Sequence, residues 1–356
     1  MSDFPSHPDA VTPDWLTDCL RRDGRWNDVV VNDVGWQAIG TGQVGDSVRF
    51  TLRCDGEGPA TLAGKFPAAD ETSRGTAVGF GLYAKEVGFY REIAPHLATR
   101  TPHCFAAHVS DDGSEFILLM EDCGPAEQGN QLEGCSDDHA REAMRQLAGL
   151  HGPSWGKQEW FAHDWLDQKP EMKAMLAAAY PQATAVFADR YRNDLPTELM
   201  EICHALGAHA EGWVQREADK RCLVHGDFRL DNMLFDIRGG AEPMATLDWQ
   251  TLVASDGLVD VGYFLGAGIK PEQRERIGDE LLGIYRKSLA AHGVERDEEE
   301  EARGLRWGAL HGVSTAVFSA AFVERTERGD KMFLAMADGA TRLARELDAL
   351  QVLEEL

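Results

Sequence analysis

The chain has 356 residues, of which 43% are hydrophobic and 27% charged, the composition of a globular protein long enough for two domains. Sixty acidic residues against thirty-five basic ones give a formal net charge of −25, a surface that repels nucleic acid and anionic membranes because both are bound through positive charge. No segment approaches the ~20 apolar residues of a membrane span, and residues 1–15 lack the basic start and apolar core of a secretory signal, so we expect a cytoplasmic protein.

Residues 1–122 predict a β-rich lobe with one helix. Short extended segments separated by glycine-containing turns are expected at residues 29–32, 48–53 and 60–66. The unbroken apolar run at residues 116–120 is typical of a buried strand. The apolar spacing over residues 84–97 predicts the helix.

A glycine-rich turn at residues 39–50 lies between two of these extended segments. Glycines let backbone amides approach phosphate groups, and small polar side chains can cap them. The candidate phosphate-binding residues of the turn are Gly42, Gly45 and Ser47. Because a β-hairpin that binds nothing can also carry glycines, the turn gains meaning only from the lysine on the strand that follows it.

That lysine, Lys65, lies between small and apolar residues on a short predicted strand, an unusual environment for a fully exposed lysine. In the predicted helix, Glu86 falls on the apolar face, whose other members at helical spacing are Tyr90, Ile93 and Leu97. A buried carboxylate is costly unless it meets a cation. We therefore expect Glu86 to pair with Lys65, and an ordinary surface lysine is the alternative.

From residue 123 onward the pattern predicts a larger, mainly helical lobe. Ser136, followed by Asp137 and Asp138, is a candidate N-cap with acids at the positive end of the helix dipole. Later helices are expected at residues 171–180, 198–218, 271–292, 306–325 and 331–350. The fold class is therefore α+β, with two lobes at residues 1–122 and 123–356.

The most informative segment of this second lobe is residues 222–235. An apolar run leads into a polar loop that carries Asp227 and Asn232, and a second apolar run follows at once. After a turn at Gly239 and Gly240, a further strand ends at Asp248. Phosphoryl transfer needs a carboxylate that orients the attacking hydroxyl and accepts its proton, and an amide oxygen and a second carboxylate that hold Mg²⁺ against the triphosphate. Each residue alone could be a turn or strand-end residue, but the joint pattern favours this chemistry.

The loop His225-Gly226-Asp227-(four residues)-Asn232 resembles the HGDxxxxN motif of aminoglycoside phosphotransferases, choline kinases and the ecdysteroid-kinase-like family. These families share the bilobal protein-kinase-like fold, with a small antiparallel sheet in the first lobe. The resemblance implies that Asp227 is the catalytic base and that Asn232 is a ligand of Mg²⁺. It makes Asp248, at the position of the kinase DFG aspartate, the second metal ligand.

Three further residues take roles from the same resemblance. Arg229 occupies the position of the kinase catalytic-loop lysine, which implies a contact with the γ-phosphate, and pairing with a nearby acid is the alternative. Asp260 is similar to a later aspartate that braces the catalytic loop, and an ordinary acid at a helix N-terminus is the alternative. His151 ends a segment similar to LxxLH and is interpreted as scaffold.

The resemblance also implies a nucleotide site in the first lobe. The pair Lys65 and Glu86 is similar to the kinase ion pair that directs the lysine to the α- and β-phosphates. Residues 118–124 are similar to the adenine-binding segment, and a generic strand end is the alternative. The residues implied there are Met120 in the adenine pocket, with the carbonyl of Glu121 and the N–H of Cys123 contacting the base.

The chain differs from protein kinases after Asp248, which is followed by Trp-Gln in place of Phe-Gly and by no APE-like segment. Protein kinases bind peptides there, so a protein substrate is not expected. Residues 86–90 and 120–122 look closest to the ecdysteroid-kinase-like branch. We therefore predict an ATP- and Mg²⁺-dependent phosphotransferase that acts on a small-molecule hydroxyl. The alternatives are a non-catalytic, nucleotide-binding pseudokinase and an antibiotic-resistance kinase for aminoglycosides.

Overall fold

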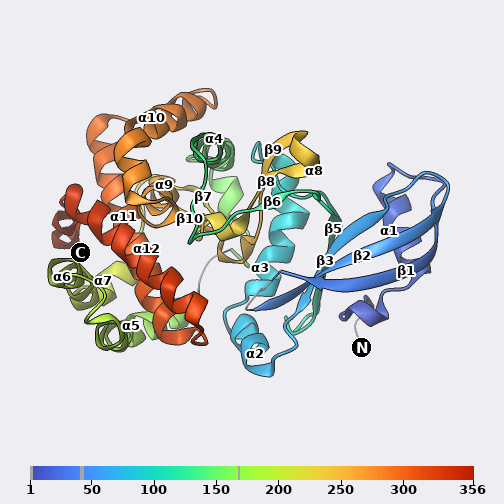
Figure 1. Cartoon of the computed structure of the whole chain (residues 1–356), viewed down its shortest axis with the longest axis horizontal. Helices are drawn as coiled ribbons and strands as arrows, with labels where there is room; N and C mark the ends of the chain where they lie inside the picture. Colours follow the sequence, from blue (N-terminus) through green and yellow to red (C-terminus); the bar gives the residue numbers. More distant parts are fainter. Residues whose placement is uncertain (1–2, 41–43, 167–168) are drawn as a thin grey trace. The chain divides into compact units, whose positions relative to one another are not determined.

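The computed structural model describes residues 3–40, 44–166 and 169–356 and divides the chain into two compact units (Figure 1). The first unit consists of Met1–His96, Thr101–Pro125 and Leu247–Thr251. The second consists of Leu97–Arg100, Ala126–Thr246 and Leu252–Leu356. The sequence-based division is a single cut after residue 122, whereas the compact units exchange two short segments, and Asp248 therefore belongs to the first unit.

A five-stranded antiparallel sheet forms the centre of the first unit, in the order β1-β2-β3-β5-β4 (Figure 1). Its strands are β1 (Val30–Ile39), β2 (Gly45–Asp55), β3 (Thr61–Pro67), β4 (Cys104–Val109) and β5 (Phe116–Glu121). The four extended segments expected from the sequence fall on β1, β2, β3 and β5. Strand β4 was not predicted, because its sequence Cys-Phe-Ala-Ala-His-Val has a single β-branched residue and no clear alternation.

One face of this sheet is covered by the first helix, α1 (Pro13–Asp23), which contributes Leu16 and Leu20 to the core. Helix α1 begins at the N-cap Thr12, whose hydroxyl accepts from the N–H of Trp15, and ends at Gly24 in the left-handed conformation. The sheet residues of this apolar cluster include Val48, Phe50, Leu62, Phe66, Ile117 and Leu119. These side chains alternate along their strands, so the opposite face of the sheet carries the remaining positions.

Two short helices follow β3, namely α2 (Glu71–Gly79) and α3 (Leu82–Gly88). Helix α3 continues as a π-helical turn over Phe89–Ile93 and a 3-10 turn over Ala94–His96. The single helix expected over residues 84–97 is therefore shorter and changes its winding, and Leu97 lies outside it in the second unit.

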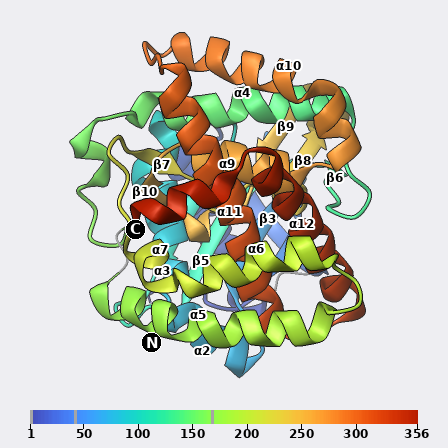
Figure 2. The ribbon, with the colours of Figure 1, turned by 90° about the vertical axis from the view of Figure 1, so that its left-hand side faces the viewer.

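The second unit is mainly helical. Its helices are α4 (Asp137–Ser154), α5 (Pro170–Tyr191), α6 (Thr197–Ala208), α7 (Ala210–Gln215), the short α8 (Ile237–Gly240), α9 (Leu258–Tyr263), α10 (Pro271–Ala290), α11 (Glu298–Phe322) and α12 (Glu327–Glu346). Helices α4 and α10 run side by side (Figure 2). Ser136 caps α4 through a bond from the N–H of His139, as predicted. The helix expected over residues 198–218 is two helices that meet at His209.

The described part of the second unit also contains short strands, which form two small sheets. A two-stranded sheet pairs β7 (Cys222–Val224) with β10 (Val253–Ser255), and a three-stranded sheet has the order β6-β8-β9. The strands of this second sheet are β6 (Glu127–Gln128), β8 (Met233–Asp236) and β9 (Glu242–Thr246). Among the described residues, no helix is long and apolar enough to cross a membrane.

Candidate active site

The first unit brings Lys65, Glu86 and Asp248 together. The Lys65 Nζ lies 2.9 Å and 2.7 Å from the two carboxylate oxygens of Glu86 and 3.1 Å from Oδ1 of Asp248. The Glu86 side chain is 2% exposed and that of Lys65 is 13% exposed, whereas Asp248 keeps 30%. Burial would lower the pKa of Lys65, but the charges of Asp248 and Glu86 outweigh it and raise this pKa. The lysine is therefore held as a cation between two carboxylates, one buried and one accessible.

The register of the sheet explains which other side chains share the face of Lys65. Ser47 on β2 and Leu118 on β5 are its direct partners, and Ala63, two residues before it, pairs with Met120. Opposite residues in antiparallel strands point to the same face. Ser47, Lys65 and Met120, three of the residues predicted to bind the nucleotide, therefore lie on the face opposite the one that α1 covers.

Of the glycine-rich turn, residues 39–40 and 44–50 are described, and Gly42 lies outside the described residues. At Gly45 a Cβ atom would stand 3.1 Å from the carbonyl oxygen of Phe66 and 3.3 Å from Cε of Lys65, so glycine leaves room for the lysine side chain. The hydroxyl of Tyr83 on α3 donates to the carbonyl of Val44 at 2.6 Å. The second half of the turn is thus tied to the helix that carries Glu86.

The side chains at the end of β5 and directly after it form hydrogen bonds with other residues of the first unit. Glu121 accepts from the N–H of His103 at 2.8 Å, and Asp122 accepts two hydrogen bonds from Arg49, at 2.6 Å and 3.0 Å. Cys123 is 4% exposed. These bonds hold the side chains of Glu121 and Asp122, and the contact of the Glu121 carbonyl and the Cys123 N–H with an adenine base stays a prediction.

Asp248 sits in a strained backbone conformation with φ of 63°, a region that residues other than glycine seldom adopt and that costs of order 1 kcal/mol. The residues around it fix this conformation. Trp249 is fully buried, stacks on Phe89 with ring centroids 3.9 Å apart, and hydrogen-bonds Glu86 through its backbone. Gln250 donates to Oδ2 of Asp248 at 3.2 Å. Trp249 and Gln250, which stand where protein kinases have Phe-Gly, therefore hold Asp248 in place.

In the second unit, the catalytic-loop candidate begins where β7 ends. Gly226 has φ of 82°, which glycine adopts without strain. The fully buried Asp260 on α9 accepts from the backbone N–H of His225 at 2.7 Å and of Gly226 at 2.9 Å. Asp260 is therefore the brace of the loop that the resemblance implied.

His151 completes this brace from α4. It is fully buried, and its Nε2 lies 3.2 Å from Oδ2 of Asp260 while its Nδ1 lies 2.9 Å from the hydroxyl of Tyr285. Burial would raise the pKa of Asp260, but the bond to His151, the nearby charges and the loop amide lower it. His151 is thus scaffold, as interpreted from the sequence.

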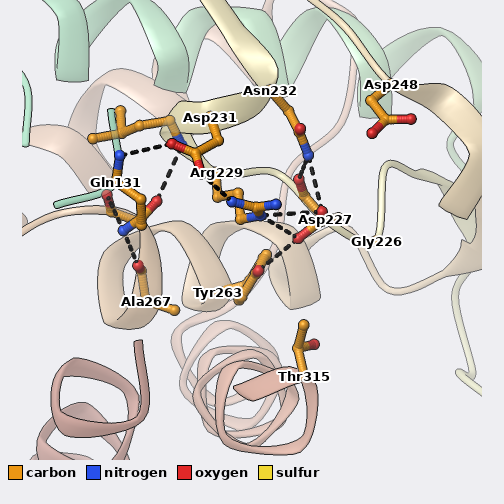
Figure 3. A network of polar contacts seen from close by, with 12 residues as sticks. Gln131, Gly226, Asp227, Arg229, Asp231, Asn232, Asp248, Tyr263, Ala267 and Thr315 are labelled. Atoms are coloured by element: carbon orange, nitrogen blue, oxygen red, sulfur yellow. Dashed lines mark hydrogen bonds and ion pairs between the residues drawn. The ribbon is translucent and has the colours of Figure 1, made fainter. Parts of the chain in front are cut away.

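The loop places Asp227 and Asn232 in direct contact (Figure 3). The Asn232 Nδ2 donates to the carbonyl of Asp227 at 2.8 Å and to its Oδ2 at 2.9 Å. With the amide nitrogen used in this way, the Asn232 Oδ1 accepts no hydrogen bond from any described residue. Asp227 keeps 21% of its side chain exposed. One loop therefore presents an accessible carboxylate and an amide oxygen oriented away from it.

Arg229 pairs with acids, the alternative that the sequence left open. Its Nε lies 3.1 Å and 3.2 Å from the carboxylate oxygens of Asp227, and its Nη1 donates to Asp231 at 2.8 Å (Figure 3). Asp231 also accepts from Arg328 on α12 at 3.0 Å. A contact between Arg229 and a phosphate stays a prediction.

Residues beyond the sequence prediction also hold this loop. The hydroxyl of Tyr263 donates to Oδ1 of Asp227 at 2.7 Å, and His311 on α11 bonds the carbonyl of Gly226 at 2.8 Å. Tyr263 follows Asp260 by three residues on α9, so the helical i, i+3 spacing places both on the side that faces the loop. That spacing was a usable signal for Tyr263, whereas the sequence held none for His311.

Comparison with solved structures finds small-molecule phosphotransferases. A putative aminoglycoside phosphotransferase from Ralstonia eutropha is 16% identical, with a TM-score of 0.55 over 93% of this chain and 97% of the other. A microcompartment-associated aminopropanol kinase is 14% identical, with a TM-score of 0.52 over 93% of this chain and 97% of the other. Likeness at this identity shows the fold, which is protein-kinase-like, and the predicted fold class is confirmed.

The family is shown by sequence. The model of the ecdysteroid kinase-like family matches residues 48–295, and the chain belongs to this family. The resemblance found in the sequence is therefore confirmed. No curated protein matches the chain.

Proposed function

We propose that this protein transfers the γ-phosphoryl group of ATP, with Mg²⁺, to a hydroxyl group of a small molecule. The observation that carries the proposal is the contact of Lys65 with Glu86 and Asp248. These residues are distant in sequence, and their contact combines a lysine held as a cation with an accessible carboxylate. A triphosphate with its metal ion needs both groups.

The sheet face around Lys65 supports nucleotide binding. Ser47 pairs with the lysine in the register, a Cβ on Gly45 would stand 3.3 Å from its Cε, and Met120 lies on the same face of the neighbouring strand β5. In this proposal the lysine contacts phosphate oxygens while Glu86 keeps it in place, and Met120 packs on the base. The ion pair with buried Glu86 prevents the lysine from turning to solvent.

Both units supply oxygen atoms of the kinds that Mg²⁺ prefers, namely carboxylate and amide oxygens, which it binds together with phosphates and water. Asp248 contributes an accessible carboxylate, and Asn232 contributes an Oδ1 that no described residue engages. When bound, the ion would neutralise charge on the phosphate oxygens during transfer. We propose these two residues as its protein ligands.

Asp227 is the proposed catalytic base. The acceptor oxygen forms a bond to the γ-phosphorus, the bond from that phosphorus to the β,γ-bridging oxygen breaks, and the proton of the hydroxyl passes to the Asp227 carboxylate. The exposed part of this side chain is available to the acceptor. Arg229, beside it, offsets negative charge near the transferred group.

The arginines around the loop bear on the alternatives. Arg229 and Arg328 both pair with Asp231, so the one acid next to Asp227 in this loop is already neutralised. An aminoglycoside carries several positive charges and would meet these two arginines, and like charges brought together are costly. This favours a neutral or singly charged alcohol at this loop. A pseudokinase is disfavoured because Lys65, Asp227, Asn232 and Asp248 are all present.

The test is a screen of phosphate acceptors. Purified protein is incubated with Mg-ATP and a panel of alcohols, amino alcohols, sterols and aminoglycosides, and mass spectrometry detects a gain of one phosphoryl group. The Asp227→Asn variant is the control, and its turnover should be lost. Binding of Mg-ATP in a thermal-shift measurement without phosphorylation of any acceptor would favour the pseudokinase.

A further inference from the structure

Among the described residues, Tyr263, which is buried, is the one from outside the loop that hydrogen-bonds the Asp227 carboxylate. Arg229 and Asn232, its other donors, belong to the same loop and move with it. Tyr263 lies on α9, is fully buried, and donates to Oδ1 at 2.7 Å (Figure 3). The terminal torsion of an aspartate is soft, with a broad range of orientations. A bond from a separate, rigid element therefore decides how the carboxylate is turned.

Helix α9 is such an element. A Cβ atom on Gly262 would come within 2.7 Å of the Cα of Gly308, so α9 and α11 meet at their backbones. Asp260, on the same helix, holds the backbone N–H groups of His225 and Gly226. Helix α9 thus fixes the loop twice, through Asp260 on its backbone and through Tyr263 on its reactive side chain.

The phenol of Tyr263 is suited to remain a donor. Burial is the main factor that raises its pKa well above the ordinary value, and the charge of Asp227 raises it further. The hydroxyl therefore stays protonated and keeps its proton during transfer. The ring is packed, with an edge-to-face contact to His311 at 5.4 Å. A phenylalanine would fill the same space and remove only the hydroxyl.

We propose that Tyr263 is a positioning residue that turns the Asp227 carboxylate toward the acceptor hydroxyl. This inference rests on the proposed function. In this proposal the hydroxyl of Tyr263 donates to the base and not to the acceptor or the phosphate, and it acts by restricting Asp227 to one orientation. Loss of a hydrogen bond to a charged group corresponds to roughly a 10- to 100-fold effect on rate when the bond matters in the transition state.

The experiment is Tyr263→Phe, assayed with the acceptor found in the screen. The kcat should fall about 10- to 100-fold, while the KM for ATP stays unchanged because the nucleotide contacts lie elsewhere. Tyr191→Phe is the matched control. Tyr191 is also buried and donates to the carboxylate of Asp330 at 3.0 Å, but it does not contact the loop. This control should keep full kcat.

A second measurement does not depend on turnover. In urea unfolding, the shifts in midpoint caused by Tyr263→Phe and by Asp227→Ala should be less than additive in the double variant, because both remove the same bond. Additive shifts would show that the bond is absent in solution and would overturn the inference. Wild-type kcat in Tyr263→Phe would overturn it as well.

Failure of the proposed function and failure of the role of Tyr263 give different experimental results. If the wild type phosphorylates no acceptor, the proposed function fails, and with it the role of Tyr263 in transfer, even if the unfolding data confirm the bond. If the wild type is active and Tyr263→Phe equals it, only the present inference fails. An equal fall of kcat in Tyr191→Phe would assign the effect to general loss of packing and would also overturn it.

Discussion

Replacement of Asp260 by asparagine should be one of the most damaging conservative changes in the second unit. The carboxylate is fully buried and accepts from His225 at 2.7 Å and from Gly226 at 2.9 Å, with His151 at 3.2 Å. In asparagine one oxygen becomes an NH₂ group, which would face one of these N–H groups. At least one buried N–H then loses its acceptor, at a cost of about 1–3 kcal/mol.

The remaining bonds also weaken, because they lose their charge. Hydrogen bonds to ionised groups are worth about 1.5–3 kcal/mol and neutral ones about 0.5–1.5 kcal/mol, so two bonds lose about 2 kcal/mol together. The expected total is about 3–5 kcal/mol, a large part of the 5–15 kcal/mol that typically stabilises a domain. Urea unfolding followed by far-ultraviolet circular dichroism measures it, because the helices of the second unit dominate that signal.

The pKa of Asp260 predicts how the stability difference between wild type and Asp260→Asn changes with pH. The pKa of Asp260 is lowered in the folded protein, and a lowered carboxylate pKa contributes stability above the unfolded pKa that is lost as pH falls through the folded one. The gap between wild type and Asp260→Asn should therefore stay constant near neutral pH and shrink below about pH 4, the ordinary range of aspartate.

The control for this variant is Asp338→Asn. Asp338 forms an i, i+4 pair with Arg342 on α12 and keeps 32% of its side chain exposed, so its loss should cost about 0.3–0.5 kcal/mol. A loss of less than about 1 kcal/mol in Asp260→Asn, or a gap to wild type that widens in acid, would refute the reasoning.

Three further predictions concern the reaction. Lys65→Met should weaken ATP binding roughly 10- to 100-fold in a calorimetric titration, because it removes a charge-assisted contact, and unchanged affinity would contradict its role. Asp227→Asn should lower kcat by about 10²–10⁴-fold with the ATP dissociation constant unchanged; a parallel loss of ATP affinity would place it in nucleotide binding instead. Asp248→Asn should move the activity curve against free Mg²⁺ to at least roughly tenfold higher concentration, since the ion loses an anionic ligand, and chelation of Mg²⁺ should abolish turnover of the wild type.

Elements that are marked by residues close together in the sequence were predicted correctly in most cases. Strands β2 and β3 are short extended segments between glycine-containing turns, β5 is an unbroken apolar run, and the N-cap Ser136 is followed by two acids, so these elements were predicted correctly. Helix α1 was missed although Thr12, Pro13 and Gly24 mark its ends. The π-helical turn after α3 was also missed, because its winding is set by packing around Phe89, which stacks on Trp249 far along the chain.

The contacts of the candidate site also divide into those that the sequence predicts and those that depend on packing. Asp227 and Asn232 are five residues apart, and their contact follows from one loop. The pairing of Lys65 with Glu86 followed from the cost of a buried carboxylate. The spacing of Tyr263 from Asp260 was a local signal, but the bond of Tyr263 to Asp227, 36 residues earlier, depends on where α9 packs, which local sequence does not give.

A net charge of −25 makes the pairing of acids the central electrostatic requirement of this protein. Three of the carboxylates described above are each matched to a different kind of partner. Glu86 meets a lysine, Asp260 meets backbone amides and a histidine, and Asp231 meets two arginines. Asp227 and Asp248 keep the accessible oxygens, with 21% and 30% of their side chains exposed. Buried acids are satisfied by the protein and the accessible ones remain for ligands, a division expected where carboxylates must bind metal or accept a proton.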